Sequence, residues 1–254
     1  MAQQSAPQPQ PATGLPMFYR RPFALQAQVH SEVSLKRTPN YRFARESNAV
    51  PITTQELFHA QRDYPIVFTN EAVPMPMAVV GLQDRVNLYV EPDGGWRRSA
   101  YVPAYVRRYP FLFSEQPESS DLTLCIDEGS ELIEATTANP FFREGKPTEV
   151  TQKALEFCLA YQRQHEATRD FGRTLAQVEL LIPRDATVKL PGGESIVVRG
   201  FKMIDEAKFN TIPAETFQDW RSKGWITLIY AHLLSLGAWD RLVQILVERR
   251  AAGR

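Results

Sequence analysis

The sequence predicts an α+β fold: an antiparallel β-rich N-terminal half, a long central helix, a β-hairpin and a helical C-terminal tail. Short β-branched and aromatic runs, separated by Pro and Gly turn signals, fill the chain up to Ile126. From Val150 onwards, apolar residues recur every three or four positions, which is the period of one helix face. A Pro-Gly-Gly turn follows this run, and closely spaced helical segments complete the chain.

Composition and length are those of an ordinary globular protein. The 254 residues are 43% apolar and 23% charged. The 29 Lys and Arg balance the 29 Asp and Glu, so no net charge attracts nucleic acid or an anionic membrane. No apolar run reaches the roughly 18 residues that a membrane-spanning helix needs. We therefore expect a protein with no membrane span and no nucleic-acid partner.

The chain is predicted to form one domain preceded by a tail. Residues 1–16 are rich in Gln, Pro and Ala and lack the pattern of a signal peptide, which predicts a disordered tail. No linker-like segment divides residues 17–254, so we expect a single domain there. Cys125 and Cys158 are too few for a disulfide scaffold, which indicates a reduced compartment, and we expect a cytoplasmic protein.

The first elements are predicted from alternation and capping. Apolar and polar residues alternate over Val29–Leu35 and again over Tyr41–Ala44, which predicts two short strands. Thr53 is followed three residues later by Glu56 and then by apolar residues. This is a capping box, and it predicts a helix that runs to about Gln61.

The stretch from Tyr64 to Ile126 is predicted to be an antiparallel meander. Tyr64–Phe68 and Leu122–Ile126 are compact β-branched runs. Val73–Leu82 is a third strand, and its prolines place its start at a sheet edge. Asn87–Glu91 and the residues from Trp96 onwards flank a Pro-Asp-Gly-Gly turn, which predicts a hairpin because Asp-Gly tolerates positive φ.

The second half is predicted to begin with one long helix, called the spine, against which other elements pack. The periodic run from Val150 to Leu181 would make a helix of about 45–50 Å, ended by Pro183 and with a possible kink at Gly172. Thr187–Leu190 and the residues from Ser195 flank the Gly-Gly turn and form a hairpin. Three short helices, delimited by Pro213, Gly224 and Gly237, close the chain.

One aromatic-rich stretch, Tyr101–Phe113, surrounds two adjacent arginines and is called the aromatic segment below. Its apolar rings favour burial, while Arg107 and Arg108 require water, carboxylates or an anionic partner. One interpretation is a basic and aromatic platform that binds a ligand or a partner. The other is a core strand whose arginines extend outward into local ion pairs. The candidate binding residues on this segment are Tyr101, Tyr105, Arg107, Arg108 and Tyr109.

Two carboxylates and a cysteine offer an enzymatic alternative. Asp127 and Glu128 follow a strand end, where they could act as an acid–base pair in a pocket with Arg107 and Arg108. The alternative is that they lie in a solvated loop, or that one of them pairs with Arg107 or Arg108 across the sheet. Cys125 precedes them, but no motif supplies a base for a thiolate, so a buried structural cysteine is the expectation.

The sequence predicts neither a metal nor a cofactor. Its four histidines show no metal-ligand spacing, and His165 and His232 fall in apolar helical surroundings typical of core histidines. The two Gly-Gly pairs lie in hairpin turns and lack the residues that follow a phosphate-binding loop.

Several of these stretches resemble the bacterial SapC family over about residues 17–236. The most specific is Tyr101-Val-Pro-Ala-Tyr-Val-Arg-Arg-Tyr-Pro-Phe, and Tyr64-Pro-Ile-Val-Phe and Gly200-Phe-Lys-Met-Ile-Asp-Glu also resemble it. The resemblance implies a link to surface-layer biogenesis. It also implies operon neighbours such as flavin-dependent tryptophan halogenase-like proteins and outer-membrane receptors. It assigns no catalytic residue, and the absence of apolar spans argues against the peptide-transporter permease of the same name.

We therefore predict a non-enzymatic accessory or binding protein of a bacterial cell, whose protein partner could be the halogenase-like protein of the same operon. The alternatives are an enzyme with a carboxylate and arginine pocket, or a structural role in surface-layer assembly. An enzyme should bring Asp127, Glu128 and the two arginines together in one pocket. A binding protein should instead expose an apolar patch beside the arginines.

Overall fold

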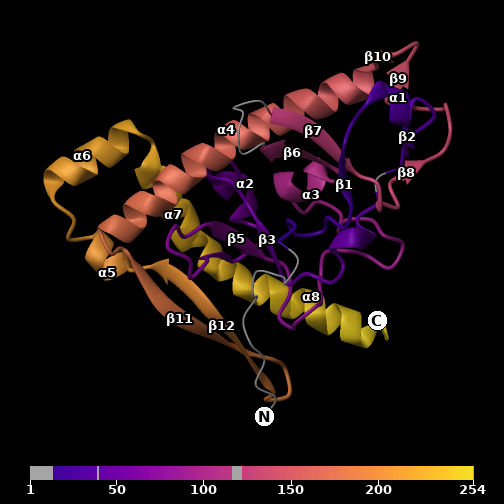
Figure 1. Ribbon diagram of the computed structural model, residues 1–254. Coiled ribbons are helices and arrows are strands. Elements are labelled where there is room, and N and C mark those ends of the chain that lie inside the picture. The colour runs from indigo at the N-terminus through magenta and orange to yellow at the C-terminus, as the bar shows by residue number, and fades with distance from the viewer. Residues whose placement is uncertain (1–13, 39, 116–121, 254) are drawn as a thin grey trace.

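Two antiparallel sheets and one long helix that packs on both define the fold (Figure 1). The computed structural model describes residues 14–38, 40–115 and 122–253. The prediction of a tail over residues 1–16 falls mostly outside these residues. The α+β fold is confirmed, with strands concentrated before the long helix and helices concentrated at the end of the chain.

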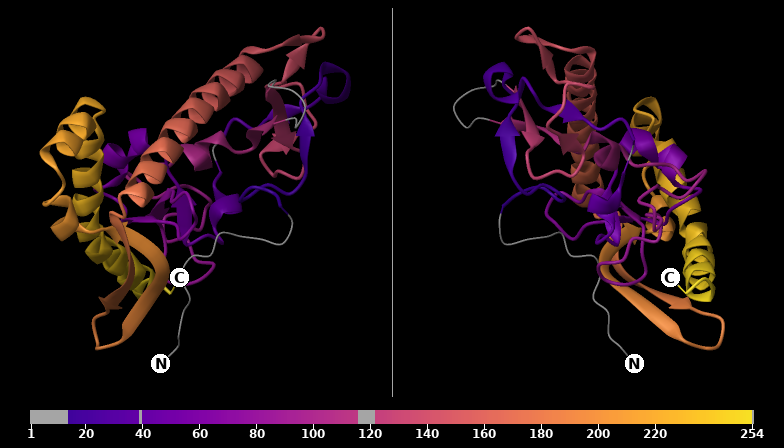
Figure 2. Two further views of the ribbon diagram at one scale, coloured as in Figure 1. Left: turned by 60° about the vertical axis from the view of Figure 1, so that its left-hand side comes forward. Right: turned by 90° about the vertical axis from the view of Figure 1, so that its right-hand side faces the viewer.

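The larger sheet has five strands in the order β11-β12-β4-β5-β3, so it joins both halves of the chain. Its strands are β3 (Ala49–Pro51), β4 (Ile66–Phe68), β5 (Pro76–Val79), β11 (Leu181–Lys189) and β12 (Ser195–Ile204). The predicted hairpin is confirmed as β11 and β12, which form an arm that extends from the body (Figure 2). The arm is attached where Lys202 pairs with Phe68.

The smaller sheet has three strands in the order β1-β7-β6. Its strands are β1 (Pro22–Ala24), β6 (Phe111–Glu115) and β7 (Leu122–Asp127). Two further pairs, β2 (Ser34–Leu35) with β8 (Ile133–Glu134) and β9 (Phe142–Arg143) with β10 (Lys146–Pro147), extend this end of the molecule. The predicted single meander is therefore wrong, because β4 and β5 lie in one sheet and β6 and β7 in the other.

Helix α4 (Glu149–Gln177) is the predicted spine, and it bridges the two sheets (Figure 1). Near its start, Ala154 and Cys158 pack with Phe111 and Ile126 of the smaller sheet. Near its end, Phe171 and Leu175 pack with Phe68 of the larger sheet. The helix ends at Gln177, earlier than the predicted end at Leu181. The prediction was too long because Leu180 and Leu181 continue the apolar pattern, although Leu180 packs in the core after the helix and Leu181 begins β11.

Gly172 lies within the continuous helix α4. A close backbone contact, rather than the predicted kink, explains why glycine occupies this position. A Cβ atom added at Gly172 would lie 2.0 Å from the carbonyl oxygen of Pro74, in the loop before β5. The loop therefore lies against the bare helix backbone at this point. Only glycine allows this approach without a shift of one element.

Gly172→Ala is expected to lower the free energy of unfolding by about 2 kcal/mol, since the overpacking cost exceeds the roughly 1 kcal/mol gain in helix propensity. Gly237→Ala is the matched control, because a Cβ there meets nothing within 4 Å. Urea denaturation of both variants measures the difference. Equal midpoints for the two variants would show that the Pro74 loop yields freely.

Three of the remaining helices form the predicted helical tail. The helices of the structure are α1 (Ala27–His30), α2 (Leu57–Ala60), α3 (Ala104–Arg108), α5 (Glu206–Phe209), α6 (Ala214–Ser222), α7 (Trp225–Ser235) and α8 (Trp239–Ala251). The short 3₁₀ segments are η1 (Arg42–Ala44), η2 (Thr54–Glu56) and η3 (Leu236–Ala238). The predicted capping box is confirmed at Thr53 and Glu56, at the start of η2 and α2.

Four local predictions were wrong. Residues 29–35 contain the end of α1 before the two-residue strand β2, and residues 42–44 form η1 rather than a strand. The predicted hairpin around residues 91–95 keeps its turn but pairs only Val90 with Trp96. Asn87 explains this, since its Oδ1 accepts from the Tyr89 amide at 2.8 Å and replaces a strand contact. Strand β5 begins at Pro76 and lies inside the sheet rather than at its edge.

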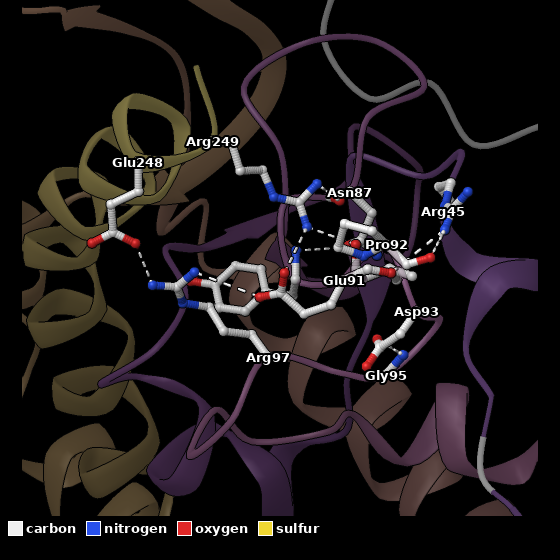
Figure 3. Close-up of polar contacts among 11 residues, drawn as sticks. Arg45, Asn87, Glu91, Pro92, Asp93, Gly95, Arg97, Glu248 and Arg249 are labelled. Atoms are coloured by element: carbon white, nitrogen blue, oxygen red, sulfur yellow. Dashed lines mark hydrogen bonds and ion pairs between the residues drawn. The ribbon is translucent and has the colours of Figure 1, made fainter. Parts of the chain in front are cut away.

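Helix α8 is fastened over the loop that carries this turn (Figure 3). Arg249 donates to the carbonyl oxygen of Val90 at 2.6 Å, and Arg97 forms ion pairs with Glu91 at 3.6 Å and Glu248 at 2.5 Å. On its other side α8 buries Leu242, Ile245 and Leu246 in the main core. The arginines of α8 thus serve the fold, and this helix caps the sheet.

None of the helices in the described part of the chain is both long enough and apolar enough to cross a membrane.

Candidate binding surface

The aromatic segment is a short helix and a strand, and this separates its two arginines. Helix α3 begins after Pro103, which suits a helix start, and it ends with the two basic residues. Successive residues of a helix point about 100° apart. Arg107 accordingly is exposed, whereas Arg108 is only partly exposed and turns toward the core. The interpretation of this segment as one core strand, with both arginines extending outward, is therefore wrong.

Buried carboxylates hold the start of the aromatic segment in place. Glu56 Oε1 accepts from the Ala104 amide at 2.6 Å and from the Tyr101 hydroxyl at 3.1 Å. Asp63 Oδ2 accepts from the Tyr101 amide at 2.9 Å. Burial, reinforced by the Glu56 carboxylate, raises the pKa of Tyr101 to about 12, so its hydroxyl stays protonated and able to donate. Neither Glu56 nor Asp63 was among the predicted site residues.

Asp127 performs the same task at the end of the segment. Its side chain is fully buried and accepts from the amides of Arg20 (3.1 Å) and Arg21 (2.7 Å) and from the Tyr109 hydroxyl (2.9 Å). Gly129 donates a fourth bond at 3.2 Å. Burial raises the pKa of Tyr109, which keeps this hydroxyl protonated. These contacts fasten β7 to the N-terminal strand β1, and they leave Asp127 paired with neither arginine of α3.

Glu128 likewise forms no ion pair with Arg107 or Arg108 among the described residues. Its carboxylate pairs with Arg21 Nε at 3.2 Å and lies 3.6 Å from Nε2 of the buried His30. The carboxylate and arginine pocket of the enzymatic alternative would need these four side chains together. In the structure Asp127 and Glu128 instead contact the segment around Arg20 and Arg21.

The cysteines are both buried and unpaired by a disulfide. The Cys125 thiol points to the carbonyl oxygen of Thr123, 3.6 Å away. Burial raises the pKa of Cys125, and it raises that of Cys158 to about 11. Both groups are therefore thiols at neutral pH rather than reactive thiolates.

At the surface, Arg107 and Tyr101 join side chains from two other elements. The Arg107 guanidinium lies 5.8 Å from the ring centroid of Tyr101 and 5.3 Å from that of Phe157 on α4. His59 on α2 stacks on Tyr101 at 5.8 Å, and Phe58 contacts His59 at 6.1 Å. We call these five residues, Phe58, His59, Tyr101, Arg107 and Phe157, the aromatic–arginine row.

The row is open to solvent, and its guanidinium keeps a free charge. Phe58 is 62% exposed, and His59 and Arg107 are also exposed. Arg107 donates to the Val102 carbonyl at 3.0 Å and to the Tyr101 hydroxyl at 3.2 Å, but no carboxylate among the described residues forms an ion pair with it. Two neutral contacts orient the guanidinium, and its charge has no ion-pair partner among the described residues.

Helix α7 carries a second exposed apolar group. Helix α2, which carries Phe58 and His59, packs against α7. Tyr230 and Leu234 lie four residues apart on one side of α7 and are 48% and 70% exposed. We call the row together with these two side chains the binding face. Sequence reasoning missed five of its seven members, since they come from α2, α4 and α7.

Among the residues that the structure describes, no three or more His, Cys, Asp or Glu side chains gather as a metal site would require. His232 illustrates the alternative role: it is buried, and its Nε2 accepts from the Ile204 amide at 3.2 Å.

Comparison with known proteins returned one family. The SapC family model matches residues 25–242, which includes the whole aromatic segment, both sheets except for β1, and α7. Neither the search of curated proteins nor that of solved structures found a match. The family match covers most of the chain, so the chain belongs to the SapC family.

Proposed function

We propose that this SapC-family protein is a non-enzymatic accessory protein that binds another protein through the binding face. The observation that carries the proposal is the exposed aromatic–arginine row, together with the exposed Tyr230 and Leu234 on α7, the helix against which α2 packs. Protein interfaces are enriched in aromatic residues and Arg at their centre, and such residues carry most of the binding energy. An ordinary surface, by contrast, holds its exposed apolar residues singly.

The chemistry of the face specifies what kind of partner fits. Arg107 is oriented by Tyr101 and Phe157 but has no carboxylate partner within the described chain. A partner that places an Asp or Glu carboxylate against Arg107 would gain a charge-assisted hydrogen bond. Apolar side chains beside that carboxylate would cover Phe58 and Leu234. We therefore propose a protein partner that presents a carboxylate flanked by apolar residues.

The first partner to test is the flavin-dependent halogenase-like protein that the SapC resemblance implies as an operon neighbour. We propose that the complex forms in the cytoplasm of a bacterial cell. A link to surface-layer or outer-membrane uptake functions belongs to the same proposal, with this protein as an accessory to that system.

The site geometry favours binding over the enzymatic alternative. That alternative assigned catalysis to Asp127 and Glu128 together with the arginines of α3. All four hydrogen-bond donors around Asp127 come from the protein itself, and they fix three chain segments to one another. A carboxylate so engaged has no lone pair directed at a substrate.

Arg107→Ala is expected to weaken the complex about tenfold or more, because hot-spot arginines contribute over 1 kcal/mol. Phe58→Ala and Leu234→Ala should each weaken it by a comparable factor. Arg143→Ala is the matched control, since Arg143 is exposed on β9 at the far end of α4. Calorimetric titration of the purified halogenase-like protein into each variant measures the dissociation constants.

Two results would contradict the proposal separately. If the wild-type protein does not bind the halogenase-like protein, this partner is wrong. If all variants bind as tightly as Arg143→Ala, the binding face is wrong. Circular dichroism of each variant confirms that the fold persists, which is expected because the three substituted side chains are exposed.

A further inference from the structure

The second arginine of α3 lies in a different environment from the first. The Arg108 guanidinium carbon lies 4.4 Å from the ring centroid of Tyr161, 4.8 Å from that of Tyr105 and 5.8 Å from that of Tyr19. All three tyrosines are buried. They come from α4, α3 and the segment before β1. We call this arrangement the tyrosine cage.

The positive charge inside the cage has no negative partner in the described chain. No ion pair joins Arg108 to a carboxylate, and its Nε is buried without a hydrogen-bond partner. Burial raises the pKa of Tyr19, Tyr105 and Tyr161, so none of them supplies a phenolate at neutral pH. Arginine itself stays protonated throughout this range.

The tyrosine hydroxyls give Arg108 only neutral contacts. Tyr19 donates to the Phe111 carbonyl at 2.5 Å, and Tyr105 donates to the Met17 carbonyl at 3.1 Å. Both hydroxyls also accept a hydrogen bond from the Arg108 guanidinium. The cage therefore offers Arg108 ring faces and neutral oxygens but no negative charge. Each such cation–π contact is worth roughly 0.5–2 kcal/mol, whereas withdrawing a charge from water costs several kcal/mol. A bound anion would supply the stabilisation that the buried positive charge of Arg108 lacks.

We propose that Arg108 and the tyrosine cage form a binding site for a compact oxyanion, either a carboxylate or a phosphate. Arg108 as a residue retains partial exposure, so part of its side chain is open to solvent although Nε is not. The planar guanidinium matches two oxygens of a carboxylate or phosphate, which a spherical halide cannot reproduce. This site is separate from the binding face and does not depend on the function proposed for it.

The test is thermal unfolding of the full chain at pH 7 and constant ionic strength, with inorganic phosphate or acetate replacing chloride. A bound anion is expected to raise the midpoint with the logarithm of its concentration once this exceeds the dissociation constant, by about 3 °C at a tenfold excess. Phosphate also stabilises proteins by exclusion from their surface, but that effect grows in proportion to the concentration. A logarithmic rise with phosphate alone, acetate alone or both identifies the preferred oxyanion.

Arg108→Met should abolish the logarithmic rise, and Arg143→Met should retain it, because Arg143 is exposed on β9 and belongs to neither the cage nor the binding face. Arg108→Lys is included in case the Met variant does not fold. It keeps the charge but loses the planar fork, so about tenfold more anion should be needed. A wild-type midpoint that does not rise, or that rises only in proportion to the anion concentration, would overturn the proposal. So would a logarithmic rise that Arg108→Met or Arg108→Lys retains unchanged.

Discussion

Glu56→Gln is expected to lower the free energy of unfolding by about 3 kcal/mol, although it preserves the size and shape of the side chain. Oε1 accepts from the Ala104 amide at 2.6 Å, and Oε2 accepts from the Thr53 amide at 2.7 Å. Whichever position the amide nitrogen of Gln takes, it faces a backbone N–H that can only donate. One buried donor then loses its acceptor, and the negative charge is lost as well.

Urea denaturation followed by tryptophan fluorescence measures this loss. Glu131→Gln is the matched control, because Glu131 is exposed, and its midpoint should stay within experimental error of the wild type. A Glu56→Gln variant that unfolds at the wild-type midpoint would show that the start of α3 does not depend on this carboxylate. The variant should also weaken partner binding, since Tyr101 and Arg107 are positioned through Glu56.

Stability is expected to fall by about 3 kcal/mol as the pH decreases from 6.5 to 4, through His232 alone. Burial lowers the pKa of His232 in the native state to about 4, against 6.5 for an unperturbed histidine. Above pH 6.5 the ring is neutral in both states and contributes no pH dependence. Between pH 6.5 and about 4, His232 binds a proton in the unfolded state but not in the native state, so the free energy of unfolding falls. Below about pH 4 it is protonated in both states.

Denaturation midpoints between pH 7 and 5 test this prediction, because few carboxylates titrate in that range. His232→Gln keeps an acceptor for the Ile204 amide but cannot be protonated, so the free energy of unfolding should vary much less with pH. A His232→Gln variant with the full wild-type slope would assign the pH dependence to another group.

Sequence reasoning was most successful where a local signal and the tertiary structure agree. The capping box at Thr53, the turn at Gly192 and the period of α4 each depend on a few neighbouring residues, and each was confirmed. Tyr41–Ala44 failed because alternation over four residues fits a 3₁₀ turn that buries one side as well as a strand. The division of the strands between two sheets could not be predicted, since it depends on which faces α4 covers.

The candidate site was predictable only in part, for a similar reason. The aromatic segment was singled out as a candidate site, but Arg107 and Arg108 were treated alike because the sequence does not show which side of α3 is covered. A helix could have been predicted here, because Pro103 suits a helix start and the basic residues Arg107 and Arg108 suit a helix end. Nothing near Tyr101 in the sequence indicates that His59 and Phe157 lie beside it, because that contact exists only after α2 and α4 have packed.

The order of strands in the larger sheet also constrains how the protein is made. β4 and β5 leave the ribosome early, but the neighbour of β4 on its other side is β12, which is synthesised only after α4 and β11. The Ser235 hydroxyl of α7 accepts a hydrogen bond from the Ile66 amide of β4 at 3.0 Å, and Ser235 is synthesised later still. Until then the edge of β4 is an open template for wrong pairing. The larger sheet therefore cannot be completed in order from the N-terminus, because β4 gains its second neighbour only after β12 has been synthesised.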